Sequence, residues 1–342
     1  MPVSAADSDR LDADLSRPSE ADTDLMRRLE GDILVLGVGG KMGPTLARLA
    51  RRASDTAARP RRVVGVARFS DPGVRPRLER WGVETIRADL LSRRDVAALP
   101  RAPNVIFMAG HKFGTAGNPG RTWAANAYLP ALVAETFPGA RTVVFSSGNV
   151  YPFSAAPGPG PSERQPTGPV GEYAQSVLGR ERLFEYFSEL HGTPAAILRL
   201  NYAVEPRYGV LRDVADQVRN RSPIDLAMGY VNVIWQRDAN SIALRLLEHC
   251  STPPLTLNVT GTEALSVRAI AERFGRVLGV EPIYRGAEEP TALLSDARQC
   301  AALLGPPATG LDEMVDRISK WILAGGSGLG KPTHFEERGG SF

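Results

Sequence analysis

The sequence predicts an α/β fold in which a doubly wound parallel sheet is followed by a small C-terminal lobe. Short, almost wholly apolar runs recur along the first part of the chain, as expected for parallel strands that are buried on both faces. These runs alternate with amphipathic helical stretches, which is the pattern of β–α–β connections. The first run passes through a glycine-rich turn directly into a helix, and this turn indicates what the sheet binds.

The first strand, Asp32–Leu36, leads into a turn with Gly37, Gly40 and Gly43, and a helical pattern follows at Thr45–Arg52. In a Rossmann-type fold these three glycines permit, in order, the tight turn, the approach of the backbone to a pyrophosphate, and close packing of the helix on the strand. The free N–H groups at the start of the helix attract the anion. The turn therefore predicts a dinucleotide site that includes Gly37, Gly40, Lys41, Met42 and Gly43. The alternative is a turn that packs the helix without a ligand.

The second strand, Arg62–Ala67, ends at Arg68, and the first carboxylate after it is Asp71. An acidic residue at this strand end binds the ribose hydroxyls of NAD, whereas an arginine accommodates the 2′-phosphate of NADP. The cofactor is therefore NADP or NAD, and Arg68 slightly favours NADP. Alternatively, Arg68 stacks on the adenine or faces solvent. A helical stretch at Pro76–Trp81 leads to the third strand.

The third and fourth strands are expected at Val83–Arg87 and Asn104–Met108. The fourth strand is followed by Ala109 and Gly110, and such small residues let a cofactor lie across the carboxyl edge of the sheet. The next helix contains Asn126, which we expect to be a further cofactor contact.

The fifth strand, Thr142–Phe145, leads into the polar segment SSGNVY. The Pro- and Gly-rich stretch 155–169 can form neither a helix nor a central strand, so we predict a surface loop beside the end of the fifth strand. A long helix is expected at Gly171–Phe187, and a sixth strand at Ala195–Leu200 delivers Asn201 at its carboxyl end.

The chain divides into four segments. Residues 1–30 are rich in Asp, Ser and Glu and have no apolar core, so we expect them to be disordered and not to be a signal peptide. Residues 31–203 form the dinucleotide-binding domain, and residues 204–324 form a substrate-binding lobe with elements that return to the core. The tail, residues 325–342, is either loose or folded back as a clasp. The helices of the lobe are expected at Leu211–Asn220, Val267–Leu278 and Leu311–Leu323.

Composition excludes several classes of protein. Apolar residues make up 43% and charged residues 23% of the 342 residues, and the formal net charge is +3, which is ordinary for a globular protein. No run of Lys and Arg interleaves with aromatic residues, so we expect no nucleic-acid partner. No apolar stretch is long enough to span a bilayer, and the cysteines and histidines stand singly. We therefore expect no membrane span, disulfide or metal site, and a reducing, cytoplasmic setting.

Taken together, the motifs resemble the extended short-chain dehydrogenase/reductase superfamily, and within it the NAD(P)-dependent epimerase/dehydratase family. The glycine turn is similar to GxxGxxG, SSGNVY to the strand-five motif SSxxVYG, and LRLN at 198–201 to RxxN of strand six. Asp89-Leu90 looks like the pair beside the adenine, and AGHK at 109–112 is similar to the AGxK of UDP-galactose 4-epimerases, whose lysine lies near the cofactor pyrophosphate. The resemblance implies cofactor contacts at Asp89, Leu90 and Lys112 and substrate contacts at Ser147 and Asn201.

The catalytic motif departs from the family. The family has Tyr-x-x-x-Lys, in which the lysine hydrogen-bonds the nicotinamide ribose and lowers the pKa of the tyrosine, whereas this chain has Tyr173 and Val177. An unperturbed tyrosine has a pKa of about 10, so Tyr173 without the lysine should be a poor base at neutral pH. Arg180 is two turns from Tyr173, so we expect no direct contact with its hydroxyl. The best substitute cation is Lys112, which is otherwise a pyrophosphate ligand or a solvated loop residue.

Two further departures bear on the substrate. Gly148 and Asn149 occupy the positions of the Asp-Glu pair of dehydratases, which argues against sugar dehydration. The segment VNVIWQRDAN resembles the family's HVxD segment, and Val231 stands where nucleotide-sugar enzymes commonly have an arginine. Arg207 or Arg237 could serve instead, and His111 is either a proton shuttle or a polar loop residue. The candidate substrate contacts are His111, Ser147, Asn149, Asn201, Arg207 and Arg237.

The leading hypothesis is an NAD(P)-dependent oxidoreductase or epimerase that acts on a hydroxyl or carbonyl carbon of a sugar or another small polyol-like molecule. Its catalytic residues are Ser147, Tyr173 and Lys112. The alternatives are a dinucleotide-binding sensor or scaffold without net redox chemistry, and an enzyme that uses the pocket for cyclisation or elimination. The partner is a small-molecule substrate, and family members often form homodimers through the helices that here contain Trp123 and Tyr173.

Overall fold

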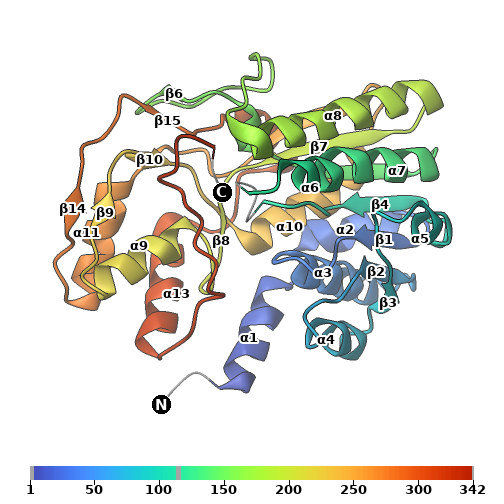
Figure 1. Ribbon diagram of the computed structural model, residues 1–342. Coiled ribbons are helices and arrows are strands. Elements are labelled where there is room, and N and C mark those ends of the chain that lie inside the picture. Colours follow the sequence, from blue (N-terminus) through green and yellow to red (C-terminus); the bar gives the residue numbers. More distant parts are fainter. Residues whose placement is uncertain (1–3, 113–116, 341–342) are drawn as a thin grey trace.

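The computed structural model describes residues 4–112 and 117–340. Its centre is a seven-stranded sheet in which every neighbouring pair of strands is parallel, with the order β12-β7-β5-β4-β1-β2-β3 (Figure 1). The prediction of a Rossmann-type, doubly wound parallel sheet is confirmed. Because β1 lies between β4 and β2, the chain reverses direction across the sheet there, and a crevice opens at the carboxyl ends of these strands. The strands are β1 (Ile33–Leu36), β2 (Val63–Ala67), β3 (Glu84–Arg87), β4 (Asn104–Phe107), β5 (Arg141–Ser147), β7 (Ala195–Leu200) and β12 (Leu255–Val259).

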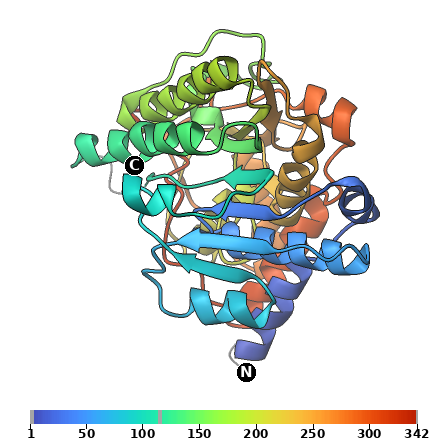
Figure 2. The ribbon, with the colours of Figure 1, turned by 90° about the vertical axis from the view of Figure 1, so that its right-hand side faces the viewer.

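Helices cover both faces of the sheet, and the alternation of side chains along β1 shows why (Figures 1 and 2). Ile33 and Val35 pack into one apolar cluster with α2, α3, α4 and α10, whereas Leu34 and Leu36 pack into another with α5, α7 and α8. All four side chains are fully buried, which explains the uninterrupted apolar run. The helices are α2 (Glu20–Arg28), α3 (Gly43–Thr56), α4 (Val74–Arg80), α5 (Arg93–Ala97), α6 (Pro119–Trp123), the π-helix η1 (Ala124–Tyr128), α7 (Leu129–Thr136), α8 (Gly171–His191) and α10 (Gln236–Arg245).

The N-terminal segment is ordered, so the expectation of disorder was wrong for its described part. Residues 5–28 form α1 (Ala5–Leu15) and α2, and each helix begins with a capping box, in which Ser4 pairs with Asp7 and Ser19 with Asp22. Leu25 and Met26 of α2 are fully buried against the core, and the carboxylate of Asp22 accepts a hydrogen bond from Ser241 at 2.6 Å. The polar composition conceals this narrow apolar face.

A smaller lobe stands beside the sheet domain (Figure 1). Its core is an apolar cluster that includes residues of α9, α11 and α13 together with Trp235 and the tail residue Phe335. The lobe and its connections comprise η2 (Gly148–Val150), β6 (Ser154–Ala155), β8 (Ala203–Val204), α9 (Val210–Arg219), β9 (Ile224–Asp225), β10 (Tyr230–Val231), β11 (Ile234–Trp235), η3 (Leu246–His249), β13 (Leu265–Ser266), α11 (Val267–Leu278), β14 (Tyr284–Arg285), β15 (Thr291–Ala292), α12 (Arg298–Leu304) and α13 (Leu311–Leu323).

The described part of the tail folds back as a clasp. The backbone N–H and the hydroxyl of Thr333 both donate to Asp213 of α9, at 2.7 and 2.6 Å, and the side chain of Phe335 is buried in the lobe. The chain then runs up to the start of α8, where a Cβ on Gly171 would lie 2.5 Å from the carbonyl oxygen of Gly340 (Figure 1). The tail therefore connects the lobe to the helix that carries Tyr173.

Candidate active site

The turn between β1 and α3 forms a cradle that only glycine can build. Gly37 has a φ of +90°, and a Cβ at this residue would lie 2.6 Å from both the N and Cα atoms of Ala109. A Cβ on Gly43 would lie 2.3 Å from the carbonyl oxygen of Val38, so the second half of the turn is equally close-packed. No side chain caps the start of α3, and although Pro44 has no N–H, the N–H groups of Gly43 and Thr45 are left available to an anion.

A cavity of about 440 Å³ lies on one side of this turn, at the ends of β2 and β3. Its walls contain Arg68 and Asp71 from the end of β2, and Arg121 adds a second guanidinium. The position of this cavity at the ends of β2 and β3 fits the adenosine half of a dinucleotide. The sequence-predicted cofactor residues that line it are Gly37, Gly40, Arg68, Asp89, Leu90, Ala109 and Gly110.

A cavity of about 1020 Å³ lies on the other side of the turn, between the sheet domain and the lobe. It brings together candidates from five separate parts of the chain. The predicted residues in its walls are Gly40, Lys41, Met42, Gly110, His111, Lys112, Ser147, Asn149, Tyr173, Asn201 and Arg207. This is the size of a site for a nicotinamide riboside together with a small substrate.

Ser147 and Tyr173 form the polar centre of the larger cavity. Ser147 is the last residue of β5, and its hydroxyl donates to Oδ1 of Asn149 at 2.8 Å. Burial raises the pKa of the Tyr173 phenol, while the charge of Arg180 and a hydrogen bond with Ser147 lower it in part. The phenol is thus neutral at neutral pH and lies next to a second hydroxyl, an arrangement suited to holding a substrate oxygen and exchanging its proton.

Three of the four lysines of the chain line the larger cavity. Burial and the charges of Lys112 and Lys331 lower the pKa of Lys41 to about 6. Burial also lowers the pKa of Lys112 to about 8. Like charges gathered in one cavity favour an anionic ligand, which would relieve their repulsion.

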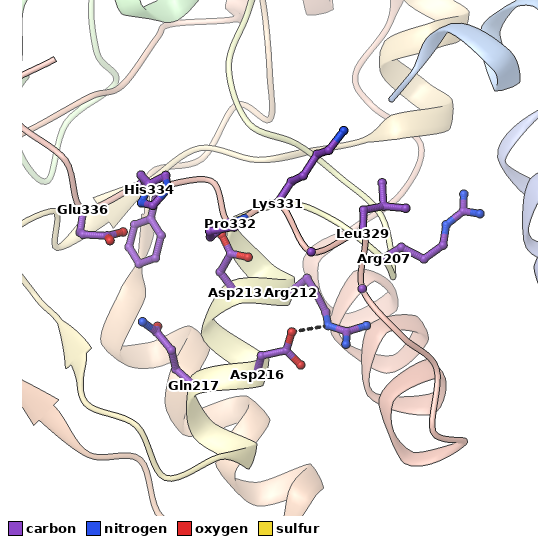
Figure 3. Close-up of a pocket in the computed structure, with 13 residues that line it drawn as sticks. Arg207, Arg212, Asp213, Asp216, Gln217, Leu329, Lys331, Pro332, His334 and Glu336 are labelled. Carbon is purple, nitrogen blue, oxygen red and sulfur yellow. Dashed lines mark hydrogen bonds and ion pairs between the residues drawn. The ribbon is translucent and has the colours of Figure 1, made fainter. Parts of the chain in front are cut away.

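Lys331 comes from the tail, in which no sequence motif marks a site residue. It borders both cavities and a neighbouring one of about 270 Å³ between α9 and the tail. Figure 3 shows that its side chain extends away from Asp213 and Asp216 of α9. The scarcity of lysine in the chain was the one available signal.

Two tyrosines of the segment after β7 were also missed. Tyr202 adopts a φ of 41°, which is strained for a residue other than glycine, and it lines the larger cavity. The ring of Tyr208 lies under Lys41, whose Nζ is 3.3 Å from its centroid. No short motif in the sequence marks either position.

The side chains of three further sequence-predicted residues are engaged with other parts of the chain. Asn126 is fully buried behind the cavity wall, where its Oδ1 accepts from the backbone N–H of His111 at 2.8 Å and so braces the loop after β4. Arg207 lines the cavity but is held by Glu205 at 3.0 Å and by Asp12 of α1 at 2.8 Å. Arg237 is not brought to the site, because its Nε donates to the carbonyl oxygen of Arg17 at 2.9 Å; its assignment to substrate binding is therefore wrong.

Arg180, for which we expected no direct contact with the Tyr173 hydroxyl, lies in the wall of the same cavity as Tyr173, and its charge lowers the pKa of the Tyr173 phenol. Val177, in contrast, is 1% exposed and packs against Val150 and Tyr151. Position 177 therefore supplies apolar packing where the family supplies a lysine.

His111 borders both cavities, and burial together with the charges of Arg121 and Arg68 lowers the pKa of its imidazole. A neutral imidazole at this place can accept a hydrogen bond from a ligand. Within residues 4–112 and 117–340, His, Cys, Asp and Glu form no cluster that could hold a metal ion. None of the helices in this described part is long and apolar enough to cross a membrane.

Fold and site together define a dinucleotide-binding α/β protein with a hydroxyl pair at the carboxyl edge of its sheet. The model of the NAD dependent epimerase/dehydratase family matches residues 33–228. This chain belongs to that family and is an enzyme of its epimerase-like type, as its motifs indicated. No curated protein sequence matches the chain.

Solved structures share the fold. UDP-glucose 4-epimerase of Thermotoga maritima, solved with UDP-glucose, is 16% identical, with a TM-score of 0.71 over 85% of this chain and 98% of that one. UDP-glucuronic acid 4-epimerase of Bacillus cereus, solved with UDP-glucuronic acid and NAD, is 17% identical, with a TM-score of 0.70 over 85% and 99%. An epimerase of Methanothermobacter thermautotrophicus is 18% identical, with a TM-score of 0.72 over 89% and 96%.

Proposed function

We propose that this chain is an NAD(P)-dependent oxidoreductase or epimerase that acts on a hydroxyl-bearing or carbonyl carbon of a sugar or another small polyol-like molecule. The observation that supports this most strongly is the pair of hydroxyls, Ser147 and Tyr173, in the wall of one cavity beside the glycine turn. The lysines in the cavity walls and the ligands named for the solved relatives make UDP-sugars the first substrates to test.

The residues of the site fit a dinucleotide. The uncapped start of α3 and the glycine turn would hold the pyrophosphate, with Lys112 nearby to neutralise it and Lys41 taking up a proton as the anion binds. Asp89 and Leu90 would lie beside the adenine. NAD and NADP are both candidates, and Arg68 in the wall of the adenosine cavity slightly favours NADP.

A bound nicotinamide supplies the capacity to accept and return a hydride. The residues of the chain position the substrate and move one proton. Ser147 holds the reacting oxygen by a hydrogen bond, and Tyr173 in its phenolate form takes the proton from that oxygen and later returns it. Because burial raises the pKa of Tyr173, a positive charge is needed nearby. Lys112, with its Nζ 5.7 Å from the centroid of the Tyr173 ring, is one candidate for this charge.

Four polar residues of the larger cavity are proposed to contact the substrate. Asn149 and Asn201 offer amide groups, and His111 offers a neutral imidazole. Arg207 supplies a guanidinium at the lobe side, fixed in place by its carboxylate partners.

The test combines binding with turnover. Wild type, Ser147→Ala and Tyr173→Phe are compared for NAD and NADP affinity by calorimetry and for conversion of a panel of UDP-sugars. Tyr186→Phe is the matched control, because this tyrosine lies on the same helix and is 58% exposed. We expect unchanged cofactor affinity and at least about a hundredfold loss of turnover for Tyr173→Phe, as for removal of a general acid–base. Wild type without affinity for either dinucleotide, or Tyr173→Phe with full turnover, would overturn the proposal.

The replacement of the motif lysine by Val177 favours a second candidate, a dinucleotide-binding sensor or scaffold. This protein would bind NAD or NADP tightly, and its bound nicotinamide would show no change of absorbance with any substrate of the panel. Enzyme and sensor therefore differ in one spectroscopic measurement.

We also propose that the protein forms a homodimer through its outer helical layer. Trp123 of α6, Tyr128 of η1 and Tyr186 of α8 are 39%, 50% and 58% exposed, and these helices contact one another. Light scattering should give the mass of a dimer for wild type and that of a monomer for Tyr186→Glu. A monomeric wild type at micromolar concentration would exclude this assembly.

A further inference from the structure

The helix that carries Tyr173 presents a cation one turn beyond the place where the family has its lysine. Tyr173, Val177 and Arg180 are spaced i, i+4 and i+7 on α8, so all three lie on one face of the helix. Val177 is taken up by apolar packing, whereas the guanidinium of Arg180 lines the larger cavity. A positive charge therefore stands about one turn further along the same face of α8.

The guanidinium of Arg180 is fixed from two sides. Its Nη1 donates to the carbonyl oxygen of Phe145 at the end of β5, at 2.6 Å, and its Nη2 donates to Oδ1 of Asn126 at 2.9 Å. The loop after β4 makes room for it, because a Cβ on Gly110 would lie 2.5 Å from Nη2. The side chain is 6% exposed, so its rotamer is set by the packing around it.

The charge of Arg180 is not cancelled locally. Neither of its two hydrogen-bond acceptors is ionised, and no carboxylate in the described part of the chain forms an ion pair with it. Glu181, its neighbour in sequence, pairs instead with Arg199, whose Nε and Nη2 donate to the two carboxylate oxygens at 3.0 and 2.7 Å. A buried arginine whose partners are neutral exerts its field on the cavity.

Several groups of the described residues act on or lie near the Tyr173 ring and phenol. They include Arg180 on its own helix, Ser147 at the end of β5, Lys112 on the loop after β4 and Tyr208 ahead of α9. Burial lowers the pKa of Arg180 to about 10, whereas that of Lys112 falls to about 8. Arg180 thus stays charged over the whole range in which an enzyme works, and Lys112 begins to lose its charge at its upper end.

We propose that Arg180 takes over the electrostatic task of the missing motif lysine and stabilises the phenolate form of Tyr173 from position i+7. It acts through Tyr173 and is therefore a positioning residue in this inference, which rests on the proposed function. Lys112 is then left to neutralise the cofactor pyrophosphate. Gly110 is needed for this arrangement, because a side chain at residue 110 would collide with the guanidinium of Arg180.

The first measurement needs no substrate. The ultraviolet absorbance of ionised phenol is titrated in wild type and in Arg180→Gln, each with its Tyr173→Phe counterpart, so that the difference isolates one tyrosine. We expect Tyr173 to ionise at least one pH unit higher in Arg180→Gln, which corresponds to about a tenfold smaller phenolate fraction at a given pH. Arg182→Gln is the control, because this side chain is 56% exposed on the same helix. An unchanged Tyr173 titration would overturn the inference.

The second measurement moves the charge back. Turnover against pH is compared for wild type, Arg180→Gln, Arg180→Lys and the double variant Val177→Lys/Arg180→Gln. Arg180→Gln should lose about tenfold or more in kcat at neutral pH, with the rising limb of its pH profile shifted upward. Arg180→Lys should keep the wild-type limb, and this variant decides the matter if the double variant does not fold. A loss in Arg180→Gln that is equal at every pH, or Arg180→Lys with the same shift as Arg180→Gln, would show a merely structural role. A wild type that turns over no substrate of the panel would instead count against the proposed function.

Discussion

The cofactor cradle yields the sharpest steric prediction, the substitution Gly37→Ala. The new Cβ would lie 2.6 Å from the N and Cα atoms of Ala109, and real Cβ atoms do not approach backbone this closely. The backbone of residue 37 also has a φ of +90°. A left-handed conformation costs a residue with a Cβ about 1–2 kcal/mol, and overpacking a tight contact adds about 1–3 kcal/mol. We therefore expect Gly37→Ala to lose about 2–5 kcal/mol of unfolding free energy.

The matched control is Gly139→Ala. Gly139 has a φ of +76°, but a Cβ there would meet nothing within 4 Å, so this variant should lose only the conformational part, about 1–2 kcal/mol. The clash at residue 37 also separates the glycine turn from the loop after β4, so the affinity for NAD or NADP should fall at least about tenfold in Gly37→Ala alone. Urea denaturation and calorimetric titration measure the two effects. Equal stability and equal cofactor affinity of the two variants would refute the reasoning.

Three further predictions follow from charged groups. Lys331→Ala should weaken the binding of NAD and of ADP-ribose about tenfold, because a cation bordering the glycine turn is lost. The control Lys320→Ala changes a side chain that is 75% exposed and should bind both ligands as wild type does. If calorimetry finds equal affinities for the two variants, Lys331 does not belong to the site. The pKa of Lys41 is about 6 in the folded chain against an ordinary value of 10.5, so the unfolded chain binds one more proton between these pH values. The free energy of unfolding should therefore rise with pH from about 6 to 9, and urea denaturation should show a smaller rise for Lys41→Met than for wild type. The same dependence of unfolding free energy on pH in both proteins would contradict the burial of the Lys41 amine. Glu181→Gln leaves the buried guanidinium of Arg199 without its carboxylate and should cost about 3–5 kcal/mol of unfolding free energy. The control Glu185→Gln removes a surface ion pair on the same helix and should cost less than about 1 kcal/mol. Similar losses of unfolding free energy in the two variants would contradict the role of the buried ion pair.

The sheet was predictable because its physics is local. A parallel strand buried on both faces must be apolar at every position, and Ile33 to Leu36 are fully buried for this reason. The glycine turn was predictable in the same way, since Gly37 and Gly43 sit where a Cβ would collide with backbone. The places of Ser147 and Tyr173 in one cavity followed from family motifs rather than from periodicity.

The N-terminal helices could have been found and were not. Ser4 with Asp7 and Ser19 with Asp22 are capping boxes that are visible in the sequence, but the polar composition outweighed them. The overall composition of a segment does not reveal a narrow apolar face on one helix, such as the face of α2 that contains Leu25.

The remaining site residues depend on contacts between distant parts of the chain. Lys331 borders the cavities because Thr333 is tied to Asp213 of another helix, and no local pattern encodes that pairing. Arg237 was assigned to the site from its position in a motif, but its side chain turns to the carbonyl oxygen of Arg17. The effect of Arg180 on Tyr173 could not be judged from their spacing alone, because spacing on a helix does not include the length of a guanidinium side chain that reaches back along it.

The measurement that tests the central claim most directly is a crystal structure of the protein with NAD or NADP bound. The account predicts the pyrophosphate on the N–H groups of the turn between β1 and α3, and the nicotinamide ring in the larger cavity within hydrogen-bonding reach of a substrate oxygen held by Ser147 and Tyr173. A dinucleotide bound elsewhere, or a nicotinamide ring directed away from the Tyr173 phenol, would contradict it.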